Sequence, residues 1–252
     1  YKLDNVSVLI VPKKDGQEIA YKVGKGEVLT HGGIPVFGLY PDYVNTVEVK
    51  YTRIDPKGAK KDISESYQIY APPVYTEVNG GASTKSTMFD TNVVKIDPKF
   101  KDRLYLVNNL LVSPPKGSRV VWNNPSGGAL EWCFYPQNAI IDTNGEVRWY
   151  LNADPIYDME SVYNGGVMMG FQQGEDGTLT WGYGQRYVKY DIMGREVFNR
   201  RLPAGYADFS HSFDQAQNGN YLLRVASNDV KRPDNKNVRT VRDVILEVSP
   251  DG

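Results

Sequence analysis

A strand–turn–strand unit built around a glycine recurs through the second half of the chain, and it constrains the fold more than any other feature. The first copy is Ala139–Trp149, with its glycine at 145, and the second is Val188–Phe198, with its glycine at 194. Val244–Gly252 repeats the first half of the unit. Between these copies a second hairpin, Asp176–Trp181, recurs as Asn218–Leu223. Each repeat therefore contains two hairpins, which makes four strands.

Four-stranded repeats of about 40–50 residues with glycine-centred turns are typical of β-propeller blades. A plain β-sandwich whose turns match by coincidence is the alternative, and the matched pair of hairpins favours the propeller. About two blades are predicted here, whereas closed propellers need about four to eight. Because an open stack of two blades would leave long unpaired sheet edges, we expect the chain to be the N-terminal portion of a longer protein.

The front of the chain is predicted to be a small antiparallel β-sandwich. Val6–Ile10 and Val47–Thr52 alternate in the two-residue period of a strand. The second run ends at Asp55–Gly58, a turn with proline in its second position and glycine in its fourth. Tyr67–Ala71 is the expected partner strand. Helical periodicity is almost absent, so the sequence predicts an all-β fold.

A small, polar segment, Gly80–Thr87, is interpreted as a loop or linker. It places the domain boundary: residues 1–85 form the sandwich domain, and residues 86–252 form the start of an incomplete propeller. The segment superficially suggests a phosphate-binding loop. That motif needs a glycine directly before its lysine, and Thr84 precedes Lys85 here. The linker is therefore the favoured interpretation.

Composition excludes several classes of protein. Lys and Arg number 29 against 30 Asp and Glu, so the net charge of −1 argues against a nucleic-acid-binding protein that depends on phosphate contacts. One cysteine excludes a disulfide scaffold and a cysteine-rich zinc site. No apolar run approaches the roughly 18 residues that a membrane-spanning helix needs, so no membrane segment is expected. We likewise expect no cofactor and no metal ion.

His211 is the main candidate for a functional side chain. It lies in Gly205–Asp214, which leads into the inner hairpin of the second predicted blade. The first strand of each propeller blade lines the central channel, where ligands usually bind. Strand alternation predicts that Phe209, His211 and Phe213 share one face. A half-buried histidine with a purely structural hydrogen bond is the alternative for His211.

Other polar or reactive residues are interpreted as structural. Asp154, Asp158 and Glu160 match no calcium-loop spacing and are predicted to form a solvated loop. Cys133 lies among apolar residues with no flanking cation, which favours a buried, unreactive thiol. The mixed charges between residues 229 and 243 are typical of an exposed hairpin loop. The four tryptophans are more typical of sheet packing than of an aromatic pocket.

The second histidine, His31, lies between a threonine and two glycines. It is predicted to be a surface polar residue in a turn of the sandwich.

Several stretches together resemble one family, the bacterial arylsulfate sulfotransferases that work without an activated-nucleotide sulfate donor. They run in order through most of the chain, so the set is far more specific than any one member. The stretches are Ile34–Tyr40, Asp102–Asn108, Ile141–Trp149, Tyr190–Gly194, Ala207–His211, Leu222–Val225 and Arg242–Val248.

This resemblance implies a small N-terminal β-sandwich followed by a six-bladed propeller. Members of the family are periplasmic homodimers that move a sulfuryl group from a phenolic sulfate ester to a phenolic acceptor, by a ping-pong route through a sulfated histidine. His211 matches a family active-site histidine that contacts the transferring group. The nucleophilic histidine, a further histidine and a sulfate-binding arginine belong to later blades, which no part of this chain matches. The family's disulfide also falls beyond Gly252, so Cys133 is not assigned to it.

The expected chemistry gives His211 the role of a hydrogen-bond donor or an acid–base group rather than that of the nucleophile. A sulfuryl group in transit spreads negative charge over its oxygens, and fixed N–H donors stabilise that charge. A phenol has a pKa of about 10, so its departure is helped by a nearby acid. Two alternatives stay open: a noncatalytic β-propeller that binds or scaffolds, with a structural His211, and an inactive fragment.

Overall fold

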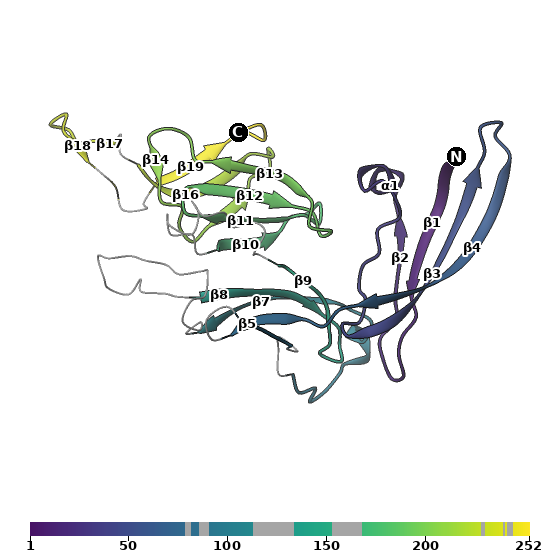
Figure 1. Ribbon diagram of the computed structural model, residues 1–252. Coiled ribbons are helices and arrows are strands. Elements are labelled where there is room, and N and C mark those ends of the chain that lie inside the picture. Colours follow the sequence, from purple (N-terminus) through teal and green to yellow (C-terminus); the bar gives the residue numbers. More distant parts are fainter. Residues whose placement is uncertain are drawn as a thin grey trace. The chain divides into compact units, whose positions relative to one another are not determined.

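The computed structural model describes residues 1–78, 82–85, 91–112, 134–152, 168–227, 230–238, 240 and 244–252 (Figure 1). Cys133, the acidic loop of Asp154, Asp158 and Glu160, and part of the charged segment 229–243 lie outside these residues. The fold is all-β, as predicted. In the described ranges the only helices are α1 (Lys25–Thr30) and the short 3-10 helix η1 (Pro98–Phe100). None of the described helices is long and apolar enough to cross a membrane.

The chain divides into two compact units. The first consists of Tyr1–Glu77, Ala82–Asn109 and Gln137–Leu151, and the second includes the described residues after Leu151. The predicted domain boundary at Lys85 stays a prediction.

The first unit contains a four-stranded antiparallel sheet in the order β2-β1-β3-β4. Alternation places Val6, Val8 and Ile10 on the buried face, with Val47 and Val49 beside them on β3. That face is covered by partly buried apolar side chains from outside the sheet: Val28, Ile34, Val36, Leu39 and Leu104. Strands β1, β3 and β4 extend the predicted runs, and β2 was not predicted. The bounds are β1 (Lys2–Ile10), β2 (Ile19–Val23), β3 (Tyr43–Ile54) and β4 (Lys60–Ala71).

The other strands of this region form a two-stranded sheet, β5-β6, and a three-stranded sheet, β7-β8-β9. Because Ala82–Lys85 is the strand β6, the prediction of a loop throughout Gly80–Thr87 was wrong at these four positions. The bounds are β5 (Tyr75–Val78), β6 (Ala82–Lys85), β7 (Tyr105–Val112), β8 (Phe134–Ile141) and β9 (Val147–Tyr150).

In the described residues the second unit contains two four-stranded antiparallel sheets and the two-stranded sheet β17-β18 (Figure 1). The first is a meander in the order β10-β11-β12-β13, so the predicted hairpins around Gly177 and Gly194 are both confirmed. In the second sheet, β16 pairs with β14, β15 and β19. Their assignment as propeller blades stays a prediction. The bounds are β10 (Met169–Gln173), β11 (Leu179–Tyr183), β12 (Arg186–Tyr190), β13 (Glu196–Arg201), β14 (Tyr206–Ala207), β15 (Phe213–Gln215), β16 (Tyr221–Ser227), β17 (Val230–Lys231), β18 (Asn237–Val238) and β19 (Val244–Val248).

The sequence repeat is explained by one local turn. In the turns at Asp142 and Asp191 the aspartate side chain accepts hydrogen bonds from the amides two and four residues later. The glycine three residues on donates its amide to the aspartate carbonyl, at 3.0 Å in both turns. Gly145 and Gly194 have φ angles of +80° and +83°, a conformation that costs a residue with a Cβ about 1–2 kcal/mol. The turn therefore selects both the aspartate and the glycine.

An aromatic core joins the two four-stranded sheets of the second unit. Tyr187 and Leu202 contribute to it from the first sheet or its end, and Phe213, Tyr221 and Leu223 contribute from the second. The Phe213 ring has its centroid 5.4 Å from that of Tyr221 and 6.2 Å from that of Tyr187. These rings anchor the segment that carries His211.

Candidate functional site

His211 lies in a bulge between β14 and β15. Both strands pair with β16, where Ala207 faces Ala226 and Phe213 faces Leu223. Residues 208–212 therefore oppose only residues 224 and 225, and the extra residues loop out of the ladder.

The predicted shared face of Phe209, His211 and Phe213 was wrong. Phe209 and Phe213 are buried, whereas His211 is exposed. The reason is the backbone of the bulge: φ is +62° at His211 and +53° at Asp208. A left-handed residue interrupts the two-residue alternation of a strand, so the imidazole leaves the face that its neighbours share.

Hydrogen bonds hold the bulge on both sides of His211. The Ser210 amide donates to the Arg224 carbonyl at 2.8 Å, and the Arg224 amide donates to the Ser212 carbonyl at 3.2 Å. The His211 amide itself points at the Met169 sulfur of β10, 3.2 Å away. At the start of the bulge the Phe209 amide donates to the Gly184 carbonyl at 2.9 Å.

A side-chain contact fixes the beginning of the bulge as well. The Gln185 Nε2 donates to the Asp208 Oδ1 at 3.1 Å, which ties the other left-handed residue to the turn after β11. The rings of Phe209 and Phe213 have their centroids 6.3 Å apart and bracket the exposed histidine.

This arrangement presents an exposed imidazole on a fixed, strained backbone. A non-glycine residue in the left-handed region costs of the order of 1–3 kcal/mol, and such residues cluster at functional sites. An imidazole can donate a hydrogen bond, accept one or transfer a proton near neutral pH. Within the ranges that the structure describes, no three His, Cys, Asp or Glu side chains gather as a metal site would require.

His31 occupies a different kind of position. It follows α1 as its C-cap, and its amide donates to the Glu27 carbonyl at 3.0 Å. Its Nε2 lies 3.4 Å from a carboxylate oxygen of Glu27, and its side chain is only 15% exposed. His31 therefore lies in a turn, as predicted, but the prediction of a surface side chain was wrong, because the imidazole is mostly buried at the end of α1.

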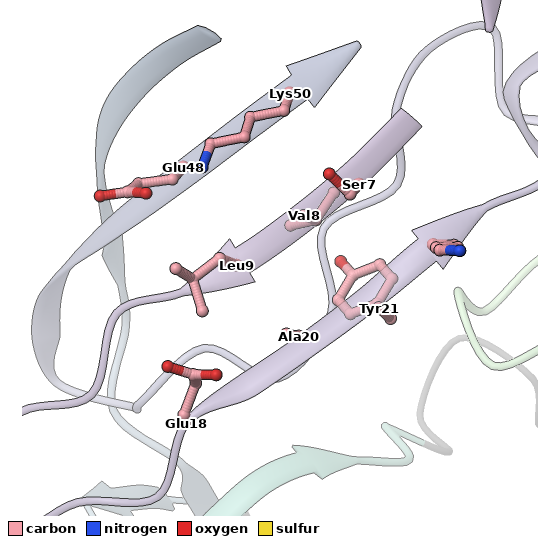
Figure 2. Close-up of a pocket in the computed structure, with 9 residues that line it drawn as sticks. Ser7, Val8, Leu9, Glu18, Ala20, Tyr21, Glu48 and Lys50 are labelled. Atoms are coloured by element: carbon pink, nitrogen blue, oxygen red, sulfur yellow. The ribbon is translucent and has the colours of Figure 1, made fainter. Parts of the chain in front are cut away.

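A groove of about 470 Å³ lies on the outer face of the first sheet. Figure 2 shows side chains from β1, β2 and β3 along it, including Leu9, Ala20, Glu48 and Lys50. Two glutamates and two lysines share the lining with small and aliphatic side chains. Because opposite charges are interspersed, no single-sign set of polar groups converges there, and we do not place the functional site in this groove.

Sequence reasoning missed a buried charged cluster in the first unit. Arg148 Nη1 lies 2.9 Å from Asp142 Oδ2, and both side chains are fully buried. The Arg148 Nε donates to the Gly38 carbonyl at 2.9 Å, and the guanidinium stands 3.6 Å above the Tyr40 ring. An enclosed, multiply bonded ion pair of this kind is structural. The signal in the sequence was an arginine in a strand only six residues after a turn aspartate.

Comparisons with known proteins cover both parts of the chain. The family model for the arylsulfotransferase (ASST) matches residues 90–252, which include His211 and its bulge. The model for the arylsulfotransferase Ig-like domain matches residues 1–72, which include the first sheet.

Two curated relatives are similar to nearly the whole chain. Arylsulfate sulfotransferase AssT of Lelliottia amnigena is 33% identical over 267 residues, which covers 100% of this chain and 44% of that protein. Arylsulfate sulfotransferase AssT of Escherichia coli O6:H1 is 33% identical over 265 residues, covering 99% of this chain and 43% of that protein. The chain thus spans less than half the length of these relatives. With one family model over most of its length and a second over its front, the chain belongs to the arylsulfotransferase family.

Proposed function

We propose that the protein containing this chain transfers a sulfuryl group from a phenolic sulfate ester to a phenolic acceptor, and that His211 takes part in the transfer. The observation that carries this proposal is the exposed imidazole on a left-handed backbone, held in a bulge within the region that the arylsulfotransferase model matches. Both curated relatives bear the name of this activity.

The role proposed for His211 is that of a hydrogen-bond donor or a general acid–base group. Negative charge grows on the sulfuryl oxygens and on the departing phenolate as the ester bond breaks. A donor held in place before the reaction stabilises this charge without having to reorganise. The hydrogen bonds of the bulge backbone with Arg224, and the contact of the His211 amide with the Met169 sulfur, support that fixed geometry.

The remaining machinery is proposed to lie outside residues 1–252. In this proposal the sulfuryl group is carried by a sulfated histidine in a ping-pong sequence, so the donor phenol leaves before the acceptor binds. Burst release of one phenolate per active site, in the absence of acceptor, is the kinetic sign of such an intermediate. Release that depends on acceptor from the first turnover would contradict it.

His211→Asn in the complete protein tests the role of the histidine. Asparagine tolerates the left-handed region better than most residues, so the bulge should persist while the imidazole is lost. We expect kcat/KM for 4-nitrophenyl sulfate with a phenol acceptor to fall by about 10²–10⁴-fold, with an unchanged melting temperature. His31→Asn, at a histidine outside the bulge, is the control and should keep normal turnover.

Near-normal turnover in His211→Asn would reject the proposed role. Loss of stability without loss of turnover per folded molecule would instead support the structural role of the noncatalytic alternative.

We further propose that the protein is periplasmic and forms a homodimer. Osmotic-shock fractionation of cells that express it tests the compartment, and recovery with the cytoplasmic fraction would reject it. Light scattering on the purified protein tests the homodimer, and a monomeric mass at micromolar concentration would reject it.

A further inference from the structure

Two glycines of the neighbouring sheet lie directly against the His211 bulge. A Cβ on Gly182, in β11, would overlap the ring of Phe209. A Cβ on Gly170, in β10, would stand 2.5 Å from the Phe213 amide nitrogen and 3.0 Å from the Ser212 carbonyl carbon. Such distances are shorter than van der Waals contact allows, so another residue would displace the Phe209 ring at position 182 and the backbone of residues 212 and 213 at position 170.

The two contacts lie on either side of His211. Phe209 precedes the histidine by two residues and Phe213 follows it by two, and both rings are buried. Between them the Met169 sulfur meets the His211 amide. Contacts from strands β10 and β11 therefore hold the chain before, at and after the histidine.

Gly182 differs from the turn glycines of the same sheet. Gly177 and Gly194 have φ angles of +79° and +83°, and a Cβ on either would meet open space. Those positions need glycine for its backbone freedom. Gly182 is not among the positive-φ residues, so glycine is needed there for space alone. A glycine inside a strand often marks the close approach of another backbone or group.

We propose that Gly170, Gly182 and Met169 are positioning residues for His211. The missing side chains of the two glycines let Phe209 and Phe213 seat against β10 and β11, and this seating holds the imidazole where the sulfuryl group is transferred. The inference rests on the proposed function of His211. A misplacement of about 1 Å in a reacting geometry can cost about 10²-fold in rate.

Gly182→Ala in the complete protein tests the proposal. The added methyl group pushes the Phe209 ring and, through it, the bulge. We expect kcat for 4-nitrophenyl sulfate to fall by about 10–100-fold, while KM changes less than about threefold, because the substrate-binding groups outside the bulge stay in place. Gly177→Ala is the matched control: it strains a turn of the same sheet without touching the bulge, and its kcat should equal that of the parent.

A rescue separates positioning from loss of stability. Phe209→Leu in the Gly182→Ala background removes ring atoms where the methyl group was added, and we expect it to recover most of kcat. In the His211→Asn background, Gly182→Ala should cause no further loss, because its effect acts through the histidine. An unchanged kcat per folded molecule in Gly182→Ala, or a full further loss in the His211→Asn background, would overturn the proposal.

A second variant covers the case in which Gly182→Ala does not fold. Met169→Leu conserves volume but removes the sulfur that faces the His211 amide. It should lower kcat by about 3–10-fold with little change in KM, and an unchanged kcat would then overturn the proposal. The proposed function has its own test, because normal turnover in His211→Asn rejects it. If His211→Asn is inactive but Gly182→Ala and Met169→Leu keep a normal kcat, only the positioning role is rejected.

Discussion

Replacing Arg148 with methionine should destabilise the first unit far more than an ordinary surface substitution. The guanidinium bonds Asp142 Oδ2 at 2.9 Å, the Gly38 carbonyl at 2.9 Å and the Gln17 carbonyl at 3.1 Å, and it stacks on Tyr40. Methionine fills part of the same space but satisfies none of these acceptors. The variant therefore removes one donor each from the Asp142 carboxylate, the Gly38 carbonyl and the Gln17 carbonyl, and the Gln17 carbonyl keeps the Tyr40 hydroxyl as a donor at 2.9 Å.

The loss in free energy of unfolding depends on which hydrogen bonds Asp142 retains. Breaking a buried ion pair by removing one partner costs about 3–5 kcal/mol, because the other charge stays buried. Asp142 Oδ1 still accepts from the amides of Asn144 and Glu146, at 2.9 and 3.0 Å. Of the two Asp142 carboxylate oxygens, only Oδ2 loses its partner. We therefore expect the free energy of unfolding to fall by about 3–4 kcal/mol, in the lower part of that range.

A matched control exists in the second unit. Arg195 pairs with Asp191 at 3.0 Å, and the Asp191 turn has the same amide bonds as the Asp142 turn. The difference is exposure, because the Arg195 side chain is 47% exposed and that of Arg148 is fully buried. Exposed ion pairs contribute about 0–1 kcal/mol, so Arg195→Met should cost no more than that.

Native-state hydrogen exchange measures the two effects locally. The Leu151 amide, which donates to the Asn138 carbonyl at 2.9 Å, reports on the pairing of β8 with the end of β9. A loss of about 3–4 kcal/mol should speed its exchange by roughly 140- to 720-fold if it opens with the unit. In Arg195→Met the exchange rates of amides in the β12–β13 hairpin should change by less than about fivefold. Equal, small effects of both substitutions would refute the reasoning that burial makes the Arg148 pair structural.

Two further predictions concern an ion pair and a turn. Burial would raise the pKa of Asp176, but its hydrogen bonds, above all that from the Lys189 ammonium, lower the pKa to about 2. The charged carboxylate therefore stabilises the fold above the unfolded pKa of about 3.9, and this contribution is lost as the pH falls through about 2. In Asp176→Asn the urea midpoint should therefore fall less between about pH 5 and 2 than in the parent. At pH 7 the substitution should lower the free energy of unfolding by less than about 1 kcal/mol, because the carboxylate is half exposed. An unchanged pH profile would contradict this. Gly145→Ala should lower the melting temperature more than Gly194→Ala, since both strain a left-handed turn but only a Cβ on Gly145 would overlap Thr91; equal melting temperatures would contradict this.

The strands and turns could be predicted because their causes are local. The aspartate and glycine of each turn are selected by bonds within five consecutive residues, as at Asp142 and Gly145. Apolar alternation in Val6–Ile10 sets the buried face of β1 in the same way. The family resemblance then singled out His211 as the candidate, whereas the residues alone left it open between a functional and a structural role, and the functional role stays a prediction.

The environment of Arg148 could not be predicted, because its causes lie far apart in the chain. Alternation would send its side chain to the opposite face from Val147, and both residues are in fact buried. The carbonyls that bind the guanidinium belong to Gln17 and Gly38, more than a hundred residues earlier. A strand pattern describes only which side a residue is on, not whether that side is covered.

The same limit explains the error at His211 and shows where the missing signal was. Strand alternation assumes an unbroken ladder of paired residues. Here the five residues 208–212 lie opposite only two residues of β16, 224 and 225, so the ladder is interrupted. What makes the bulge fit is a property of another strand, the glycine at 182 between Trp181 and Tyr183, both of which are buried. A glycine flanked by large buried aromatics in a strand loses packing on its own sheet, so it indicates that another segment occupies the vacated space. That segment is the one that carries His211, which makes the strand glycine the residue through which the scaffold sets the geometry of the proposed active site.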